Sequence, residues 1–194
     1  MYRMPDRLFP YEIFALETER LRLSVLKKSC AGMVTDYLKR NRGFHQRFSQ
    51  THNASYFTYQ TQKKYLKFDA EDFKKGRIFP FWITLKDDPS KIIGRVSYFN
   101  VALGGMMSCS IGYHLDKDHL SMGYMTEAIT EADAFLFDEM KFHRIEAFIL
   151  PENERSLKLI KKLGYRYEGT RISYMHINGE WRDHEAFFKL NKNN

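Results

Sequence analysis

The first half of the chain carries both strand and helix spacing in its hydrophobic residues. Residues 17–26 alternate apolar and polar side chains, which predicts a strand with one buried face. Residues 31–39 and the charged stretch 56–75 repeat apolar side chains at helical spacing, with a loop expected at 41–53. Three further strands, separated by turn sequences rich in Asp, Pro and Gly, are predicted at residues 81–85, 91–101 and 106–115.

Strands and helices alternate in the second half. Residues 123–141 show an amphipathic helical pattern, 144–150 a short strand pattern, and 153–163 a helical pattern that Gly164 closes. This strand–helix order implies parallel pairing, at least locally. Asn178-Gly179 is typical of a type I′ hairpin turn. The strands of that hairpin are expected at residues 171–177 and 180–190.

These elements define the expected fold class. It is one α/β (or α+β) domain with a mixed, mostly antiparallel sheet of about seven strands. The domain would span residues 1–194, with 1–16 as an N-terminal extension. A length of 194 residues and a hydrophobic content of 43% suffice for a substantial core.

Cysteine content and hydropathy bear on location. The two cysteines, Cys30 and Cys109, lie far apart and suggest neither a disulfide framework nor a metal site. Residues 1–9 are charged and do not resemble a signal peptide. No stretch approaches the roughly 20 apolar residues of a membrane span. We therefore expect a cytoplasmic protein with no membrane partner.

The formal net charge of +7 means that the surface favours anions. Nucleic acid, the ribosome and a phosphate-bearing cofactor are all candidate partners. The basic residues are scattered, however, and Lys158, Lys161 and Lys162 fit a solvated helix face. Because no basic stripe or nucleic-acid-binding motif is present, direct nucleic-acid recognition is not expected.

Two strand–helix junctions are candidates for ligand binding. Gly123 stands at the start of one helix, where exposed N–H groups and the helix dipole suit a phosphate. Asn153 and Ser156 stand one turn apart at the start of the next helix. A ligand contact is one interpretation of Asn153, and helix capping is the alternative. Adjacent strands that both open onto helix starts form the usual ligand crevice of an α/β unit.

Six short motifs follow one another along this chain. Four are Ser110-Ile-Gly-Tyr-His-Leu115, Gly123-Tyr-Met-Thr-Glu-Ala128, Pro151-Glu-Asn-Glu-Arg-Ser-Leu157 and Lys162-Leu-Gly-Tyr165. In order and spacing they resemble the GNAT superfamily of acyl-CoA-dependent N-acyltransferases. The others, Asn41-Arg-Gly-Phe44 and Ile177-Asn-Gly-Glu-Trp-Arg-Asp-His184, resemble its ribosomal-protein alanine N-acetyltransferase branch. The likeness covers roughly residues 17–190.

The resemblance implies how acetyl-CoA would bind. The sheet would splay between its fourth and fifth strands, at 106–115 and 144–150, with helices on both faces. The pantetheine arm would lie in the split, against Tyr113, His114, Leu115 and the Asn153 side chain. Ser156 would lie near the sulfur. The pyrophosphate would accept backbone hydrogen bonds from Ser121, Met122, Gly123, Tyr124, Met125 and Thr126.

The sequence also departs from the family pattern. Of the family's Q/R-x-x-G-x-G/A run, Leu120–Met125 keeps only Gly123, which puts cofactor affinity in doubt. A Tyr that serves as acid in many relatives is replaced by Ile160, which shifts that role to Ser156. No carboxylate occurs in residues 106–115, so the general base stays open.

The expected reaction is direct attack of an amine on the thioester, without a covalent enzyme intermediate. A backbone N–H near Tyr113 or His114 would hold the oxyanion, and Ser156 or water would protonate the thiolate. Cys109 fits a small buried hydrophobe better than a nucleophile. Glu127, in a helix interior, fits a structural hydrogen bond.

Aromatic residues outside these motifs are candidates for acceptor binding. Phe44 and Phe48 would either cover the acceptor or anchor a long loop, and Trp181 would either frame the acceptor or pack on the sheet. The histidines lack the spacing of metal ligands, so no metal is expected.

We therefore expect an enzyme that acetylates a primary amine, with the N-terminal amine of a (ribosomal) protein as the preferred acceptor. One alternative is acetylation of a small amine, such as a polyamine or an aminoglycoside. Another is a non-catalytic acyl-CoA-binding or ribosome-binding module. The protein would be a monomer or a homodimer.

Overall fold

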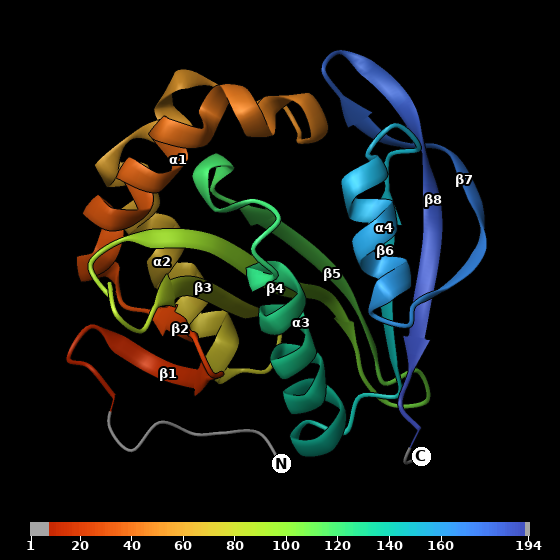
Figure 1. The fold of residues 1–194 in the computed structure, drawn as a ribbon, viewed down its shortest axis with the longest axis horizontal. Coiled ribbons are helices and arrows are strands. Elements are labelled where there is room, and N and C mark those ends of the chain that lie inside the picture. The colour runs from red at the N-terminus through yellow and green to blue at the C-terminus, as the bar shows by residue number, and fades with distance from the viewer. Residues whose placement is uncertain (1–7, 193–194) are drawn as a thin grey trace.

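The computed structural model describes residues 8–192, in which eight strands form one sheet in the order β1-β2-β3-β4-β5-β6-β8-β7 (Figure 1). All neighbouring strands are antiparallel except β5 and β6, which are parallel as predicted. The strands are β1 (Glu12–Glu17), β2 (Leu21–Leu26), β3 (Phe79–Leu85), β4 (Ile92–Ala102), β5 (Ser108–Leu115), β6 (Arg144–Ile149), β7 (Arg166–Ile177) and β8 (Glu180–Leu190).

The eighth strand, β1, is the element that the hydrophobic pattern missed. The stretch 17–26, predicted as one strand, is the second half of a β1–β2 hairpin, so the predicted extension 1–16 overlaps the sheet. Glu12 is buried, and its carboxylate accepts hydrogen bonds from Arg22 (2.7 and 2.6 Å) and from Ser24 (2.5 Å). Buried polar residues that satisfy one another disturb the apolar–polar alternation from which strands are predicted.

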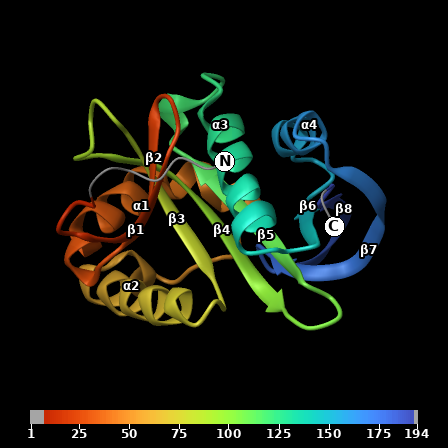
Figure 2. The same cartoon turned by 90° about the horizontal axis from the view of Figure 1, so that it is seen from below.

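Helices cover both faces of the sheet, as predicted (Figure 2). Helices α1 and α2 lie on one face, where Val34, Tyr37 and Leu66 pack with Trp82 and Ile92. Helices α3 and α4 lie on the other face, over the larger core cluster. The helices are α1 (Ala31–His45), α2 (Tyr59–Lys74), α3 (Tyr124–Ala134) and α4 (Glu154–Lys162), and a π-helical turn, Phe135–Glu139, continues α3.

Helix α1 is longer than its sequence pattern indicates, because the expected loop 41–53 begins as helix. Asn41 is fully buried, donates to the Tyr37 carbonyl (3.0 Å) and accepts from the Lys117 N–H (3.0 Å). These bonds join α1 to the segment after β5. The extension carries Phe44 and His45 toward the centre of the sheet.

The sheet splits between β5 and β6, as predicted (Figure 1). Their pairing runs from Ser108 opposite Arg144 to Ile111 opposite Ala147 and then stops. Beyond that point the strands diverge. The β7–β8 hairpin lies beside β6, and its Asn178-Gly179 turn has two positive φ angles (51° and 91°), as a type I′ turn requires.

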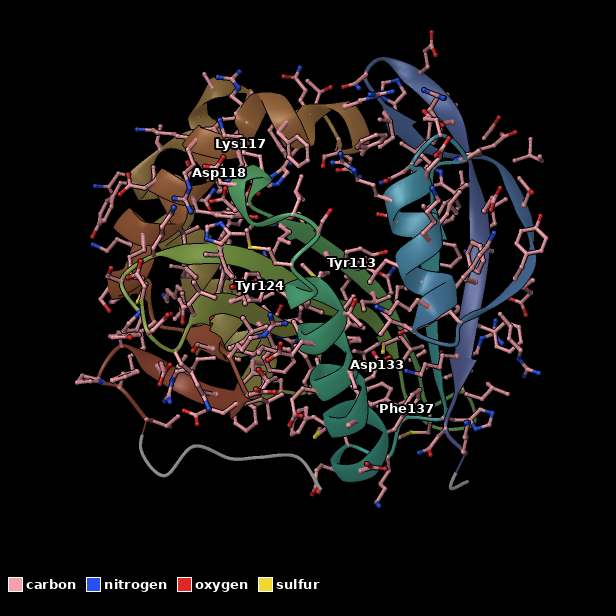
Figure 3. The ribbon with its side chains drawn as sticks, viewed as in Figure 1. Tyr113, Lys117, Asp118, Tyr124, Asp133 and Phe137 are labelled. Carbon is pink, nitrogen blue, oxygen red and sulfur yellow. The ribbon has the colours of Figure 1, made fainter. Side chains whose placement is uncertain are left out.

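A buried polar cluster ties the two sides of the sheet together. Asp133, on α3 (Figure 3), accepts hydrogen bonds from Tyr98 of β4 (2.7 Å) and from Tyr165 (3.1 Å). It also pairs with Lys189 of β8 at 2.7 Å. Burial raises the pKa of Asp133, although Lys189 and the two hydroxyls act to lower it. Because the bonding groups come from both sides of the split, the cluster fixes the separation of its walls.

No helix in residues 8–192 is both long and apolar enough to cross a membrane.

We predict that Asp133→Ala lowers the free energy of unfolding by about 3 kcal/mol, because it leaves an ammonium and two hydroxyls without their acceptor. Urea denaturation measures this change. Glu139→Ala, at an exposed position of the π-helical turn, is the control and should shift stability by less than about 0.5 kcal/mol. Equal stability of the two variants would contradict the tying role of Asp133.

Candidate active site

Two adjoining hollows occupy the split. The first, of about 190 Å³, lies between β5, α3, α4 and the end of α1, and the second, of about 220 Å³, lies toward β6, β7 and β8. Tyr113, which lies in the gap between α3 and α4 (Figure 3), lines both hollows, as do Asn153 and Ser156. The two hollows therefore form one passage through the sheet, and these three residues lie where the hollows meet.

The backbone of β5 beyond Ile111 faces this passage on one edge. Residues of an antiparallel ladder bond to the neighbouring strand alternately. Since the Asp116 N–H donates to the Ile93 carbonyl of β4 (2.7 Å), the same alternation turns Tyr113 and Leu115 toward the split. The Leu115 carbonyl accordingly accepts a hydrogen bond from His45 (2.8 Å) rather than from β4. An extended amide chain in the first hollow would meet these backbone groups.

Asn153 caps the start of α4. Its side-chain oxygen accepts from the Ser156 N–H (3.2 Å), which is the capping interaction. No hydrogen-bond partner for its NH₂ group is found among residues 8–192, so this group remains a donor for a ligand. Ser156 borders both hollows, and its carbonyl accepts a long hydrogen bond (3.4 Å) from the Tyr113 hydroxyl.

Burial keeps three titratable groups of the first hollow, Tyr113, His45 and His114, in their neutral forms. Burial raises the pKa of Tyr113 to about 12, so its phenol is protonated at neutral pH. Burial lowers the pKa of His45 and of His114. The His114 ring bonds to the Tyr37 hydroxyl (2.7 Å) and lies 5.0 Å from that of His45. Sequence reasoning missed His45 and Tyr37, because only the tertiary path of α1 brings them here.

The loop before α3 has the geometry of a helix start that is open to an anion. Gly123 is the N-cap of α3 with φ of +81°, and Ser121 also has positive φ (62°). Arg20, from the β1–β2 turn, donates to the Met122 carbonyl (3.0 Å) and stacks over the Tyr124 ring (4.6 Å). A residue distant in sequence therefore holds this loop in place.

Glu127 anchors Arg20 in turn. Its carboxylate accepts from the Arg20 backbone (2.9 Å), the Arg20 side chain (2.7 Å) and the Thr18 hydroxyl (2.5 Å). Burial acts to raise the pKa of Glu127, but these hydrogen bonds outweigh it and lower the pKa. The carboxylate is fully engaged, which fits the structural role expected for it.

The structure brings most of the predicted site residues together. The first hollow is bordered by Phe44, Phe48, Tyr113, His114, Leu115, Met125, Asn153 and Ser156. The predicted residues Ser121, Met122, Gly123, Tyr124 and Thr126 are not part of its lining and adjoin it through Leu120 and Met125. Arg155 and His184, which line the first and second hollow respectively, were not among the predicted site residues.

Trp181 lies apart from this group. Its side chain is 65% exposed, packs edge-on against His176 (5.5 Å) and borders a separate surface depression on the β7–β8 hairpin. That depression shares Gln50 and Met175 with the second hollow. Any contact of Trp181 with an acceptor would therefore be outside the passage itself.

A thiol nucleophile and a metal ion would each give this region a different chemistry. Cys109 is 1% exposed, and burial raises the pKa of its thiol, which fits the predicted buried hydrophobe. Within the described part of the chain, no group of three or more His, Cys, Asp or Glu side chains is arranged to hold a metal ion.

The sheet splayed at β5 and β6, with a helix start on each side, is the arrangement of a GNAT acetyltransferase. The Acetyltransferase (GNAT) domain family matches residues 20–166. The chain belongs to this family and is an acyl-CoA-dependent acetyltransferase.

Individual N-acetyltransferases of this family are similar to most of the chain. It is 38% identical over 152 residues to a probable N-acetyltransferase, YjcK, of Bacillus subtilis (strain 168), covering 78% of this chain and 83% of the relative. It is 31% identical over 169 residues to the [ribosomal protein uS5]-alanine N-acetyltransferase of Escherichia coli (strain K12), covering 87% of each.

Solved structures agree with this placement. The ribosomal-protein-S5-alanine acetyltransferase of Vibrio fischeri superposes with a TM-score of 0.87 at 31% identity, covering 92% of this chain and 97% of that one. RimJ of Mycobacterium smegmatis, solved in complex with CoA-disulfide, shares the fold at 21% identity, with a TM-score of 0.83 and coverage of 99% of this chain and 86% of that one.

Proposed function

We propose that this enzyme transfers the acetyl group of acetyl-CoA to the N-terminal amine of a protein in the cytoplasm, with a ribosomal protein as the favoured acceptor. The observation that carries the proposal is the passage through the sheet. It offers one hollow beside the β5 backbone for a thioester and a second hollow, beyond Tyr113 and Ser156, for the amine.

The cofactor half of the proposal uses backbone groups. The pantetheine amides would pair with Tyr113 and Leu115 and with the Asn153 side chain. The pyrophosphate would accept N–H groups at the start of α3, where Gly123 allows close approach. Only one glycine of the family run is present, but Arg20 fixes the loop through the Met122 carbonyl. Neighbours in the fold solved with CoA or acetyl-CoA support this arrangement.

The chemistry would then be direct. The amine nitrogen forms a bond to the thioester carbonyl carbon and gives up one proton to a base, and the resulting oxyanion accepts a hydrogen bond from the Tyr113 N–H. The C–S bond breaks, and the thiolate takes a proton from Ser156 or from water. Holding both reactants in one passage lowers the barrier by removing the entropy cost of their encounter.

The lining of the second hollow favours a protein N-terminus over a polyamine. It is apolar on one side, with Ile149, Leu150 and Met175, and no Asp or Glu of residues 8–192 lines either hollow. A polyamine would bring extra ammonium groups that need carboxylate partners. A single amine beside a small apolar side chain meets no such cost. Relatives that act on the alanine of ribosomal protein uS5 support this acceptor.

Turnover on defined acceptors tests the proposed function. We expect kcat/KM for a peptide beginning with alanine to exceed that for spermidine by at least about tenfold, measured as release of the CoA thiol. The same peptide with a blocked N-terminus is the control and should give no release. Faster acetylation of spermidine would favour the small-amine alternative, and binding of acetyl-CoA without turnover on any amine would favour the non-catalytic one.

A carboxylate at position 123 should weaken cofactor binding. A Cβ there would meet only the Arg20 guanidinium, at 3.4 Å, but every side chain is strained at φ of +81°. Gly123→Ala carries this strain alone, and Gly123→Asp adds a negative charge. We expect the Kd for acetyl-CoA, measured by calorimetry, to be at least about tenfold weaker for Gly123→Asp than for Gly123→Ala. Equal values would place the pyrophosphate elsewhere.

Removal of the Ser156 hydroxyl tests the acid. We expect Ser156→Ala to lower kcat by roughly 10²-fold, at the lower end of the effect of a general acid because water can substitute for it. The Kd for acetyl-CoA should be unchanged, because the capping bond uses the Ser156 backbone. A raised Kd with unchanged kcat would instead make Ser156 a binding residue.

A further inference from the structure

His184 borders the second hollow from strand β8 with one ring nitrogen fixed. Its Nδ1 lies 3.1 Å from the Arg182 carbonyl oxygen, which can only accept a hydrogen bond. The proton of the neutral ring is therefore on Nδ1, and Nε2 carries a lone pair. No hydrogen-bond partner for Nε2 is found among residues 8–192. The residue is 3% exposed and shares the hollow with Tyr113 and Ser156.

A bulge in the neighbouring strand holds the ring in this position. Arg171 pairs with His184 and Met175 pairs with Arg182, so three residues of β7 stand opposite one residue of β8. The bulge is fixed where the Ser173 N–H donates to Asp183 (2.7 Å). Bulges are frequent beside active sites because they redirect side chains.

The Tyr174 ring lies within this bulge and contacts His184 edge-on, with ring centres 5.7 Å apart. The Tyr174 ring also packs against Phe148, with ring centres 4.9 Å apart, so the bulge joins His184 to a residue of β6 that lines the same hollow.

Burial and nearby charges act in opposite directions on the His184 ring. Burial is the main cause of the lowered pKa of His184, and Arg182 acts in the same direction. Glu152 and Asp183 act to raise it, as does the hydrogen bond to the Arg182 carbonyl. Arg171 of β7 stacks over Phe148 and Tyr174, and Tyr113 faces the hollow from β5. The imidazole is neutral at pH 7, with two carboxylates near enough to favour an added proton.

The other groups that line the hollows are less suited to accept a proton. The phenol of Tyr113 is protonated at neutral pH. His45 and His114 border the first hollow, where the cofactor is placed, and are not part of the lining of the second. No carboxylate in the described part of the chain lines either hollow.

We propose that His184 is the general base of the reaction, taking the proton from the acceptor nitrogen on Nε2 as the N–C bond forms. This inference rests on the proposed function. The nitrogen loses one proton to the imidazole, the C–S bond breaks, and the thiolate is protonated separately from Ser156 or water. The imidazolium then returns its proton to solvent through the open side of the hollow.

The test compares wild type with His184→Asn, because an Asn amide can still donate to the Arg182 carbonyl but cannot accept the proton. We expect kcat for an alanine-initiated peptide to fall by roughly 10²-fold at pH 7. Wild-type kcat should fall as the pH drops through the pKa of His184, which burial places below its usual value, because the ring becomes protonated. In the variant this fall should be absent, and the pH dependence of kcat should follow only the ionisation of the acceptor amine. The Kd for acetyl-CoA should not change.

Two further variants make the result specific. Imidazole in the buffer should restore turnover to His184→Ala. His143→Gln, at an exposed position before β6, should match wild type. Should the position-184 variants fail to fold, nitrogen NMR of the wild-type protein decides, and a proton on Nε2 rather than Nδ1 at pH 7.5 would overturn the proposal.

The outcomes separate the two proposals. Wild-type turnover with an unchanged rate and pH profile in His184→Asn would overturn the role of His184 and leave the proposed function standing. Acetyl-CoA binding by the wild type without turnover on any amine would overturn the proposed function and the general base with it.

Discussion

The end of pairing between β5 and β6 is the constraint on which the rest of the structure depends. After Ile111 and Ala147 the two strands no longer share hydrogen bonds, so backbone groups of β5 face a passage instead of a neighbour. Backbone groups in a protein interior need hydrogen-bond partners. The groups of β5 that have no strand partner can therefore bond to a ligand. The divergence is stable because Asp133 joins β4 to β8.

Burial also sets the chemical character of the passage. It raises the pKa of the Tyr113 phenol and lowers the pKa of His45, His114 and His184, so these groups are uncharged at neutral pH. A lining with no carboxylate from residues 8–192 does not hold an ammonium ion by charge pairing. It suits instead an amine that loses its proton inside the site, which makes the position of a proton acceptor decisive for the proposed reaction.

The loop before α3 is held in shape by a residue that is distant in the sequence. The family run of glycines is reduced to Gly123, yet the loop has a defined shape. Arg20, from a turn over a hundred positions earlier, bonds to the Met122 carbonyl and stacks on Tyr124, and Glu127 holds Arg20 in place. A change in Arg20 should therefore act on the loop as directly as a change within it.

The sequence by itself determined the strand–helix alternation, the parallel β5–β6 pair, the Asn178-Gly179 hairpin and the family, because these depend on local periodicity, turn chemistry and short motifs. It missed β1, whose buried Glu12 is matched by Arg22, and the end of α1, where Asn41 bonds to Lys117. Local patterns also did not predict that His45 and His184 line the passage, or that Trp181 lies outside it. Tertiary structure decided these features because each depends on contacts between residues far apart in the chain, which a local pattern does not record.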